Sequence, residues 1–159
     1  KGMKLEGKKL VVGYDMRPTS EPFHKAVIRG MNDEGVDVVN IGFASTPLFG
    51  FACSNFGEYA GGIIVTASHN TAEYNGFKMT LGDGSPIGKG SGMEELRDMV
   101  ELNQFEDAKK KGVVSEHDVL GEYFERIFEL VPKDAIKPQK VVIDAANGMA
   151  AATFPKLVE

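Results

Sequence analysis

The chain has 159 residues, 42% of them hydrophobic and 26% charged, so it can bury the core of one domain or slightly more. Its formal net charge of −5 argues against a nucleic-acid partner, which would favour a basic surface. No run of about 18 apolar residues is present, so we expect no membrane partner, and the N-terminus is too polar for a secretory signal peptide. Because Cys53 is the only cysteine, no intramolecular disulfide can form, and we expect a reduced, cytoplasmic setting.

The first part of the chain predicts a strand, a helix and a second strand. Residues 10–13 form a short β-branched run that is typical of a buried strand. Thr19 or Ser20 can cap a helix whose apolar residues recur at helical spacing and which ends at Gly35. Residues 36–42 form the next β-branched run. Elements of these lengths predict parallel strands joined by a right-handed crossover.

The next segment predicts a second helix and two more strands. A Thr-Pro pair at residues 46–47 favours a helix start, because proline is well tolerated in the first turn. Residues 62–66 predict a third strand. Residues 74–81 contain an Asn-Gly turn that leads into a fourth strand. Because the connection is short, we expect this strand to run antiparallel to its neighbour.

The remainder predicts a glycine-rich loop, two helices, a linker and the start of another unit. In chain order these are the loop at 82–92, helices at 93–102 and 118–131, a linker at 137–138, a strand at 141–144, a turn at 147–148 and a helix at 153–159. One strand and part of a helix cannot form a core by themselves. We therefore expect an α/β domain with a mixed, mostly parallel sheet flanked by helices over residues 1–136, and an incomplete second α/β domain over residues 137–159.

The most informative motif is Thr-Ala-Ser-His-Asn at residues 66–70, followed by Tyr-Asn-Gly-Phe-Lys at residues 74–78. It lies where a predicted strand ends, and ligands of open α/β sheets bind outside the carboxyl ends of strands. The hydroxyl of Ser68 can accept a phosphoryl group, whose oxygens nearby cations can neutralise. Since the same residue types are common in structural turns, the residues alone leave both a catalytic loop and a plain turn open.

The two segments of this motif closely resemble the phosphoserine signature of the α-D-phosphohexomutases. Three further stretches agree with that family in order and spacing, namely residues 12–17, 46–47 and 141–148. The resemblance extends from about residue 10 onward. One position departs from it: Thr71 stands where the family usually has a proline, which would fix the backbone of the loop.

The resemblance implies an intramolecular phosphotransferase of the phosphomannomutase/phosphoglucomutase type, which interconverts hexose 1-phosphate and hexose 6-phosphate. Phosphorylated Ser68 would donate its group to the substrate and regain one from a hexose 1,6-bisphosphate intermediate. The resemblance also implies catalytic roles for His69 and Lys78 and phosphate contacts for Arg17 and Asn70. It implies Mg²⁺ bound by phosphorylated Ser68 together with carboxylates outside this chain.

The expected partners are a hexose phosphate and the remaining domains of the same enzyme. The sequence contains no Gly-Ile-Arg-Gly loop before the first strand, and no metal-binding, sugar-reading or C-terminal phosphate-binding loop of that family. We therefore expect a fragment that is inactive alone. The alternative is a non-catalytic α/β module that binds a sugar phosphate or another protein.

Other chemically suggestive residues predict structural roles. The glycine-rich segment at residues 82–91 lacks the spacing of a nucleotide-binding P-loop, so we expect a flexible loop. His24 and His117 lie on or beside predicted helices and are expected to be surface or capping residues rather than ligands. Cys53 lies among apolar residues and is expected to be a small buried hydrophobe.

Overall fold

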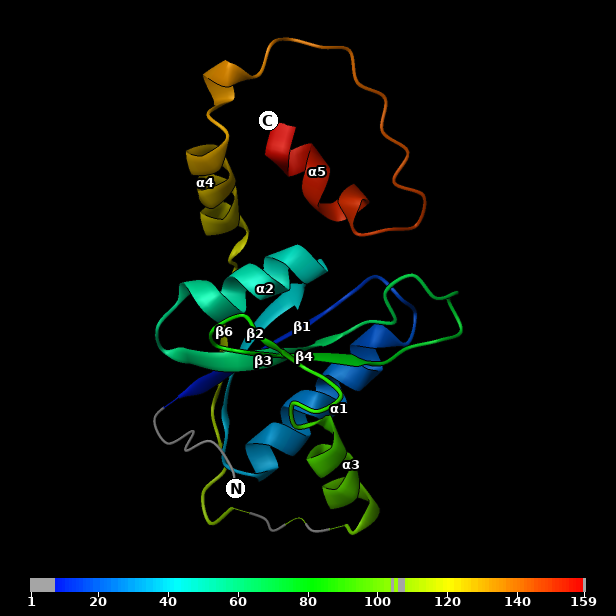
Figure 1. Cartoon of the computed structure of the whole chain (residues 1–159), viewed down its shortest axis with the longest axis vertical. Helices are drawn as coiled ribbons and strands as arrows, with labels where there is room; N and C mark the ends of the chain where they lie inside the picture. Colours follow the sequence, from blue (N-terminus) through cyan, green and yellow to red (C-terminus); the bar gives the residue numbers. More distant parts are fainter. Residues whose placement is uncertain (1–7, 104, 106–107, 159) are drawn as a thin grey trace.

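A mixed β-sheet organises the chain, as the computed structural model of residues 8–103, 105 and 108–158 shows (Figure 1). Within those residues the sheet has six strands in the order β5-β4-β3-β1-β2-β6. The strands are β1 (Lys9–Tyr14), β2 (Asp37–Phe43), β3 (Tyr59–Val65), β4 (Phe77–Leu81), β5 (Pro86–Ile87) and β6 (Val114–Glu116). β1, β2, β3 and β6 run parallel, whereas β4 and β5 are antiparallel to their neighbours. The predicted fold class is confirmed, including the antiparallel fourth strand.

The helices cover both faces of this sheet (Figure 1). They are α1 (Ser20–Asp33), α2 (Thr46–Asn55), α3 (Met93–Glu101), α4 (Leu120–Leu130), the short 3₁₀ helix η1 (Lys133–Ala135) and α5 (Ala150–Val158). The crossover from β1 to β2 and the crossover from β2 to β3 run in opposite directions along the sheet. Right-handed connections therefore place α1 and α2 on opposite faces, with α3 on the side of α1.

The central strands are buried on both faces, as expected for a parallel sheet covered by helices. Fully buried core side chains come from β1, β2, β3 and α2: Val11, Val12, Val38, Val39, Ile64, Val65, Phe49 and Cys53. Burial raises the pKa of the Cys53 thiol to about 12, so the thiol stays protonated. The prediction of a small buried hydrophobe at this position is confirmed.

Glycine at position 62 is required where β3 pairs with Val11 of β1. A Cβ atom there would stand 2.2 Å from the carbonyl oxygen of Val11 and 3.0 Å from the ring of Phe49. Neither neighbour can withdraw freely, because one is backbone in the central strand and the other is a fully buried side chain. The absence of a side chain therefore sets how closely the two central strands pair.

We predict that Gly62→Ala lowers the free energy of unfolding by about 3 kcal/mol, because the added methyl overpacks the sheet. The control is Gly50→Ala on α2, where a Cβ would meet nothing within 4 Å. That change should leave stability equal or raise it by up to about 1 kcal/mol. Urea unfolding of the two variants measures both effects, and equal midpoints would contradict the close-packing argument.

Two edge strands were not predicted. β5 consists of two residues inside the segment expected to be a flexible loop, and β6 consists of three exposed residues. Each is paired on one side only, so neither needs an apolar run. Such strands form because the neighbouring strand offers unpaired backbone groups, which the local sequence does not reveal.

The strand expected at residues 141–144 is absent, and this prediction was wrong. These residues have no regular structure, and Val142 is 98% exposed. A strand needs a hydrogen-bonded neighbour, and no other strand of the described chain pairs with this segment. The turn at residues 147–148 is present, with the amide of Gly148 donating to the carbonyl of Ala145. The domain boundary after residue 136 stays a prediction.

His24 is buried, which corrects the expectation of a surface or capping residue. It is 4% exposed on α1, and its Nε2 lies 2.9 Å from Oδ1 of Asn40 on β2. Desolvation lowers the pKa of His24 below its ordinary value, against smaller opposing contributions from hydrogen bonds. His117 is also partnered, by the Tyr59 hydroxyl at 2.9 Å and Glu122 at 3.0 Å, so it ties α4 to the sheet.

We predict that the free energy of unfolding decreases as the pH falls from 7.5 to 5.5. Because the folded-state pKa of His24 is lowered, the unfolded state binds more protons below the ordinary value of 6.5. His24→Gln removes the titrating ring while keeping an amide that can reach Asn40, so its stability should depend less on pH over this range. Urea titrations at several pH values measure the slopes, and identical slopes in both proteins would exclude His24 as their source.

In the part of the chain that the structure describes, no helix is both long enough and apolar enough to cross a bilayer.

Candidate active site

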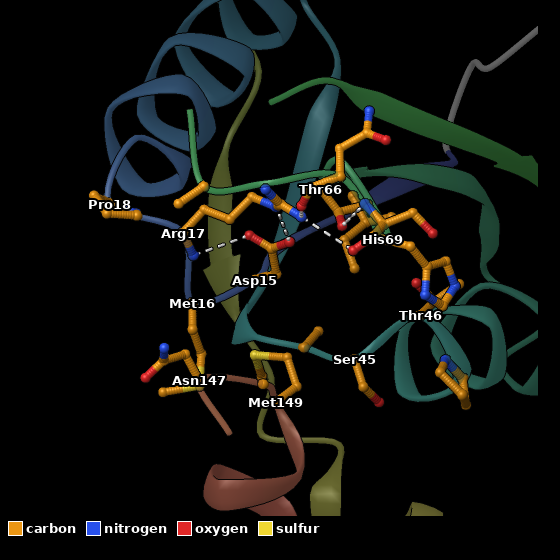
Figure 2. A pocket seen from close by; sticks show the side chains of 17 residues that line it. Asp15, Met16, Arg17, Pro18, Ser45, Thr46, Thr66, His69, Asn147 and Met149 are labelled. Carbon is orange, nitrogen blue, oxygen red and sulfur yellow. Dashed lines mark hydrogen bonds and ion pairs between the residues drawn. The ribbon is translucent and has the colours of Figure 1, made fainter. Parts of the chain in front are cut away.

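A cavity of about 580 Å³ opens at the carboxyl ends of β1 and β3 (Figure 2). Its walls are residues 15–18 after β1, residues 44–47 at the start of α2, and the loop that follows β3. Residues 147–149 face that loop from the opposite side, ahead of α5 (Figure 2). The carboxyl edge of the parallel strands is where ligands of open α/β sheets bind.

Ser68 lies in the loop after β3 in a backbone conformation that is uncommon for its residue type. Its φ angle is +57°, in the left-handed region. Its amide donates to the hydroxyl oxygen of Thr66 at 2.9 Å, and its own side chain is exposed toward the cavity. Such conformations cost of order 1–3 kcal/mol and persist only where the surroundings hold them.

Lys78 stands beside the Ser68 hydroxyl, with Nζ donating to Oγ at 3.3 Å. The antiparallel pairing explains this proximity, because Lys78 on β4 lies opposite Ile64 near the end of β3. The hairpin thus brings an ammonium group to a serine ten positions earlier in the chain. His69 and Asn70 are exposed and line the same cavity.

Arg17 extends from the end of β1 under the Ser68 loop (Figure 2). Its Nε donates to Oδ2 of Asp15 at 3.2 Å. Its terminal nitrogens donate to four loop carbonyls, those of Ser68 (3.0 Å), Asn70 (2.7 Å), Thr71 (2.6 Å) and Tyr74 (3.1 Å). These contacts engage all five N–H groups of the guanidinium. The expected phosphate contact of Arg17 stays a prediction.

Four further residues, to which the sequence assigned no role at the site, complete the support of this loop. The carboxylate of Asp15 accepts from the backbone amide of Arg17 at 3.1 Å and from the Ser20 hydroxyl at 2.6 Å. Asn75 donates to the hydroxyls of Thr19 at 2.9 Å and Ser20 at 3.0 Å. Thr19 occupies the N-cap position of α1, but its hydroxyl makes no capping bond to the helix and instead accepts from Asn75 of the loop. In the sequence, the one sign of this network is Asp15 two positions before Arg17, at the end of the first predicted strand.

The described residues do not supply a complete metal site. Within them, no group of three or more His, Cys, Asp or Glu side chains is arranged to hold a metal ion. Asp15, the one carboxylate among the described residues that lines the cavity, already accepts hydrogen bonds from Arg17 and Ser20.

The fold thus places an exposed serine hydroxyl beside a lysine ammonium at the carboxyl edge of an α/β sheet. Residues 2–107 match the family model described as "Phosphoglucomutase/phosphomannomutase, alpha/beta/alpha domain I". The chain therefore belongs to the phosphoglucomutase/phosphomannomutase family, and the resemblance drawn from the sequence is confirmed.

Proteins similar to this chain carry related names. A phosphomannomutase of Vibrio cholerae is 37% identical over 150 residues, which are 94% of this chain and 32% of that protein. A phosphoglucomutase of Neisseria meningitidis is also 37% identical over 150 residues, with 94% and 31% covered. The crystal structure of a phosphoglucomutase/phosphomannomutase family protein from Burkholderia thailandensis superimposes with a TM-score of 0.81 at 32% identity, covering 95% of this chain and 33% of that one. The chain thus spans about a third of the length of these relatives.

We predict that Ser68→Gly raises the free energy of unfolding by about 0.5–1 kcal/mol, because glycine adopts positive φ without a Cβ penalty. Ser68→Ala should change stability by less than about 0.5 kcal/mol, since the exposed hydroxyl contributes little to folding. The matched control is Ser54→Gly on α2, an exposed helical serine, which should lose about 0.5 kcal/mol. If Ser68→Gly destabilised the protein as Ser54→Gly does, the backbone at residue 68 would not be strained.

Proposed function

We propose that this chain carries the phosphoserine of a phosphohexomutase of the phosphomannomutase/phosphoglucomutase type, which interconverts hexose 1-phosphate and hexose 6-phosphate. The observation that supports this most is the Ser68 hydroxyl, exposed in a cavity with Nζ of Lys78 3.3 Å away. A phosphoserine carries about −1.5 to −2 charges near neutral pH, so an adjacent ammonium stabilises it.

The proposed chemistry is two successive phosphoryl transfers. In the first, the bond between phosphorus and Ser68 Oγ breaks while a bond forms to a free hydroxyl of the hexose phosphate. The sugar hydroxyl gives up its proton, Ser68 Oγ gains one, and the product is a hexose 1,6-bisphosphate. In the second, the other phosphoryl group returns to Ser68 Oγ and the protons move in reverse, so phosphate is neither gained nor lost.

The remaining site residues have supporting roles in this proposal. Lys78 neutralises phosphoryl oxygens, and His69 contacts the phosphoryl group or moves the proton. Asn70 contacts a phosphate. Mg²⁺ would offset phosphoryl charge, with an oxygen of phosphorylated Ser68 as one ligand and carboxylates outside this chain as others. Because the described residues do not complete such a site, we assign no step to the metal.

We propose that residues outside this chain select the sugar and complete the active site. Similar proteins are named phosphomannomutase, phosphoglucomutase and probable phosphoglucosamine mutase, so these names do not choose the sugar. We propose a mannose or glucose phosphate because residues 74–78 resemble the phosphomannomutase/phosphoglucomutase branch of the family. We also propose that the 159-residue chain alone is inactive, because group transfer depends on holding the acceptor in line with the donor.

The test is ³¹P NMR of the full-length protein with mannose, glucose or glucosamine 1-phosphate, Mg²⁺ and catalytic hexose 1,6-bisphosphate. We predict conversion to the 6-phosphate and a fall in kcat of about three orders of magnitude or more in Ser68→Ala. Ser54→Ala, which changes an exposed serine on α2 that does not line the cavity, should retain wild-type kcat.

Three outcomes would count against the proposal. Near-normal turnover by Ser68→Ala would remove Ser68 from the mechanism. Binding of hexose phosphate without turnover by the wild-type protein would favour the non-catalytic module. Full turnover by the 159-residue chain alone would show that no further part is needed.

A further inference from the structure

We infer that Arg17 is a positioning residue that holds the Ser68 loop in its reactive shape by binding loop carbonyls, rather than a residue that binds phosphate. Its consequence for catalysis rests on the function proposed above. The shape of the loop itself can be tested without any catalytic assay.

The hydrogen-bond capacity of Arg17 carries the first step. A guanidinium has five N–H donors and no acceptor, and here one donor goes to Asp15 and four go to loop carbonyls. A phosphoryl oxygen could bind Arg17 only by displacing one of these bonds. In the arrangement observed, four N–H donors of Arg17 therefore bind the loop backbone and the fifth binds Asp15, which leaves no N–H group for a phosphate.

The loop needs such a partner because it makes few bonds of its own. Between residues 67 and 75, two backbone bonds form turns, from the amide of Asn70 to Ala67 and from the amide of Tyr74 to Thr71. Peptide carbonyls are strong acceptors that favour a partner. Arg17 provides one for four carbonyls from residues 68 to 74, so one side chain closes the whole turn.

The conformation of Ser68 carries the second step. Its left-handed φ of +57° costs free energy, and Thr71, three positions later in the loop, does not restrict the backbone as a proline would. The amide of Ser68 is held by Thr66 and its carbonyl by Arg17, so the peptide groups on both sides of the residue are fixed. Together these two bonds fix the direction of the Cα–Cβ bond that carries the Oγ atom.

The four bonds from Arg17 also orient the amides on the opposite side of the loop. All peptide bonds of the described chain are trans, so each N–H points away from the carbonyl of the preceding residue. The amides that follow the clamped carbonyls of Ser68, Asn70 and Thr71 thus point away from the guanidinium. The side of the loop turned from Arg17 therefore carries N–H groups rather than carbonyls.

Arg17 can act this way because it is itself fixed. Its side chain is 12% exposed and forms an ion pair with Asp15, whose side chain is 13% exposed. Asp15 is held in turn by the fully buried Ser20, and its amide donates to the carbonyl of Val65 at the end of β3. The guanidinium is therefore fixed relative to the strand that leads into the Ser68 loop.

Two substitutions separate positioning from phosphate binding. Arg17→Lys keeps the positive charge but replaces the planar fork with a single ammonium that cannot reach four carbonyls together. Arg17→Gln removes the charge as well. If Arg17 acts by charge on a phosphate, Arg17→Lys should preserve most activity; if it acts by geometry, both variants should fail alike.

The first measurement is amide hydrogen exchange in this chain, read at the hydrogen-bonded amides of Thr66, Ser68, Asn70 and Tyr74. We expect exchange at least tenfold faster in both Arg17 variants, with amides of β1 and β2 unchanged. The matched controls are Arg97→Lys and Arg97→Gln, because Arg97 is exposed on α3 and, among the described residues, forms its ion pairs with Asp98 and Glu101 of its own helix. Unchanged loop exchange in the Arg17 variants would overturn the inference.

The second measurement is the kinetics of the full-length protein. We expect kcat to fall about 100-fold or more in both Arg17 variants, while the KM for hexose phosphate stays within about threefold, because a misplaced nucleophile slows transfer without weakening binding. A kcat near wild type in Arg17→Lys, or a raised KM with unchanged kcat, would overturn the inference in favour of phosphate binding.

Faster exchange in β1 and β2 would show that the Arg17 variants unfold. In that case a milder variant, Asp15→Asn, tests the inference. Asp15→Asn removes the carboxylate that fixes the guanidinium but keeps the side-chain shape. We expect a smaller increase in loop exchange, with the sheet unchanged, and no increase would overturn the inference. If the wild-type full-length protein shows no mutase turnover, the proposed function fails, whereas the exchange measurements still decide the role of Arg17.

Discussion

The parallel pairing of β1 with β3 is the contact on which the site depends. The two strands lie side by side in register from Leu10 opposite Gly61 to Tyr14 opposite Val65. Because they run in the same direction, both end at the same edge of the sheet, one leading into Arg17 and the other into Ser68. Glycine at position 62 permits this approach, since any Cβ would meet the backbone of β1.

At that edge of the sheet, the guanidinium of a mostly buried ion pair binds the carbonyls of the loop. Ion pairs on protein surfaces contribute little to stability, because water screens them and their side chains must be ordered. The pair formed by Arg17 and Asp15 is mostly buried, and the guanidinium serves the backbone of a second segment. The pair therefore matters for the shape of the loop more than for overall stability. Four bonds from the planar guanidinium hold a loop that has little regular structure of its own.

The region after α4 lacks comparable support. Residues 137–149 form an extended connection without helix or strand before α5 (Figure 1), and their apolar side chains Val141 and Val142 are exposed. Asn147 and Met149 nevertheless line the same cavity as Ser68. They lie opposite Thr66 and His69 (Figure 2). The cavity is therefore lined by residues of the sheet domain and by residues 147–149, although only the former are held in place by the sheet.

The sequence by itself determined the central fold and the position of the motif. β-branched runs, a helix-starting Thr-Pro pair and an Asn-Gly turn predicted the parallel unit and the antiparallel return strand, because these signals are local. Local patterns also placed Ser68 and Lys78 on a strand end and a returning strand.

Only the tertiary structure decided which groups hold that loop. The bonds from Arg17 to the carbonyls of Ser68 and Tyr74 span more than 50 positions and involve backbone atoms, which every residue possesses. No residue pattern marks such a bond. The burial of His24 and the short edge strand β6 likewise depend on what packs or pairs beside them. The strand expected at residues 141–144 did not form for the same physical reason: an extended segment becomes a strand only when a neighbour accepts its hydrogen bonds.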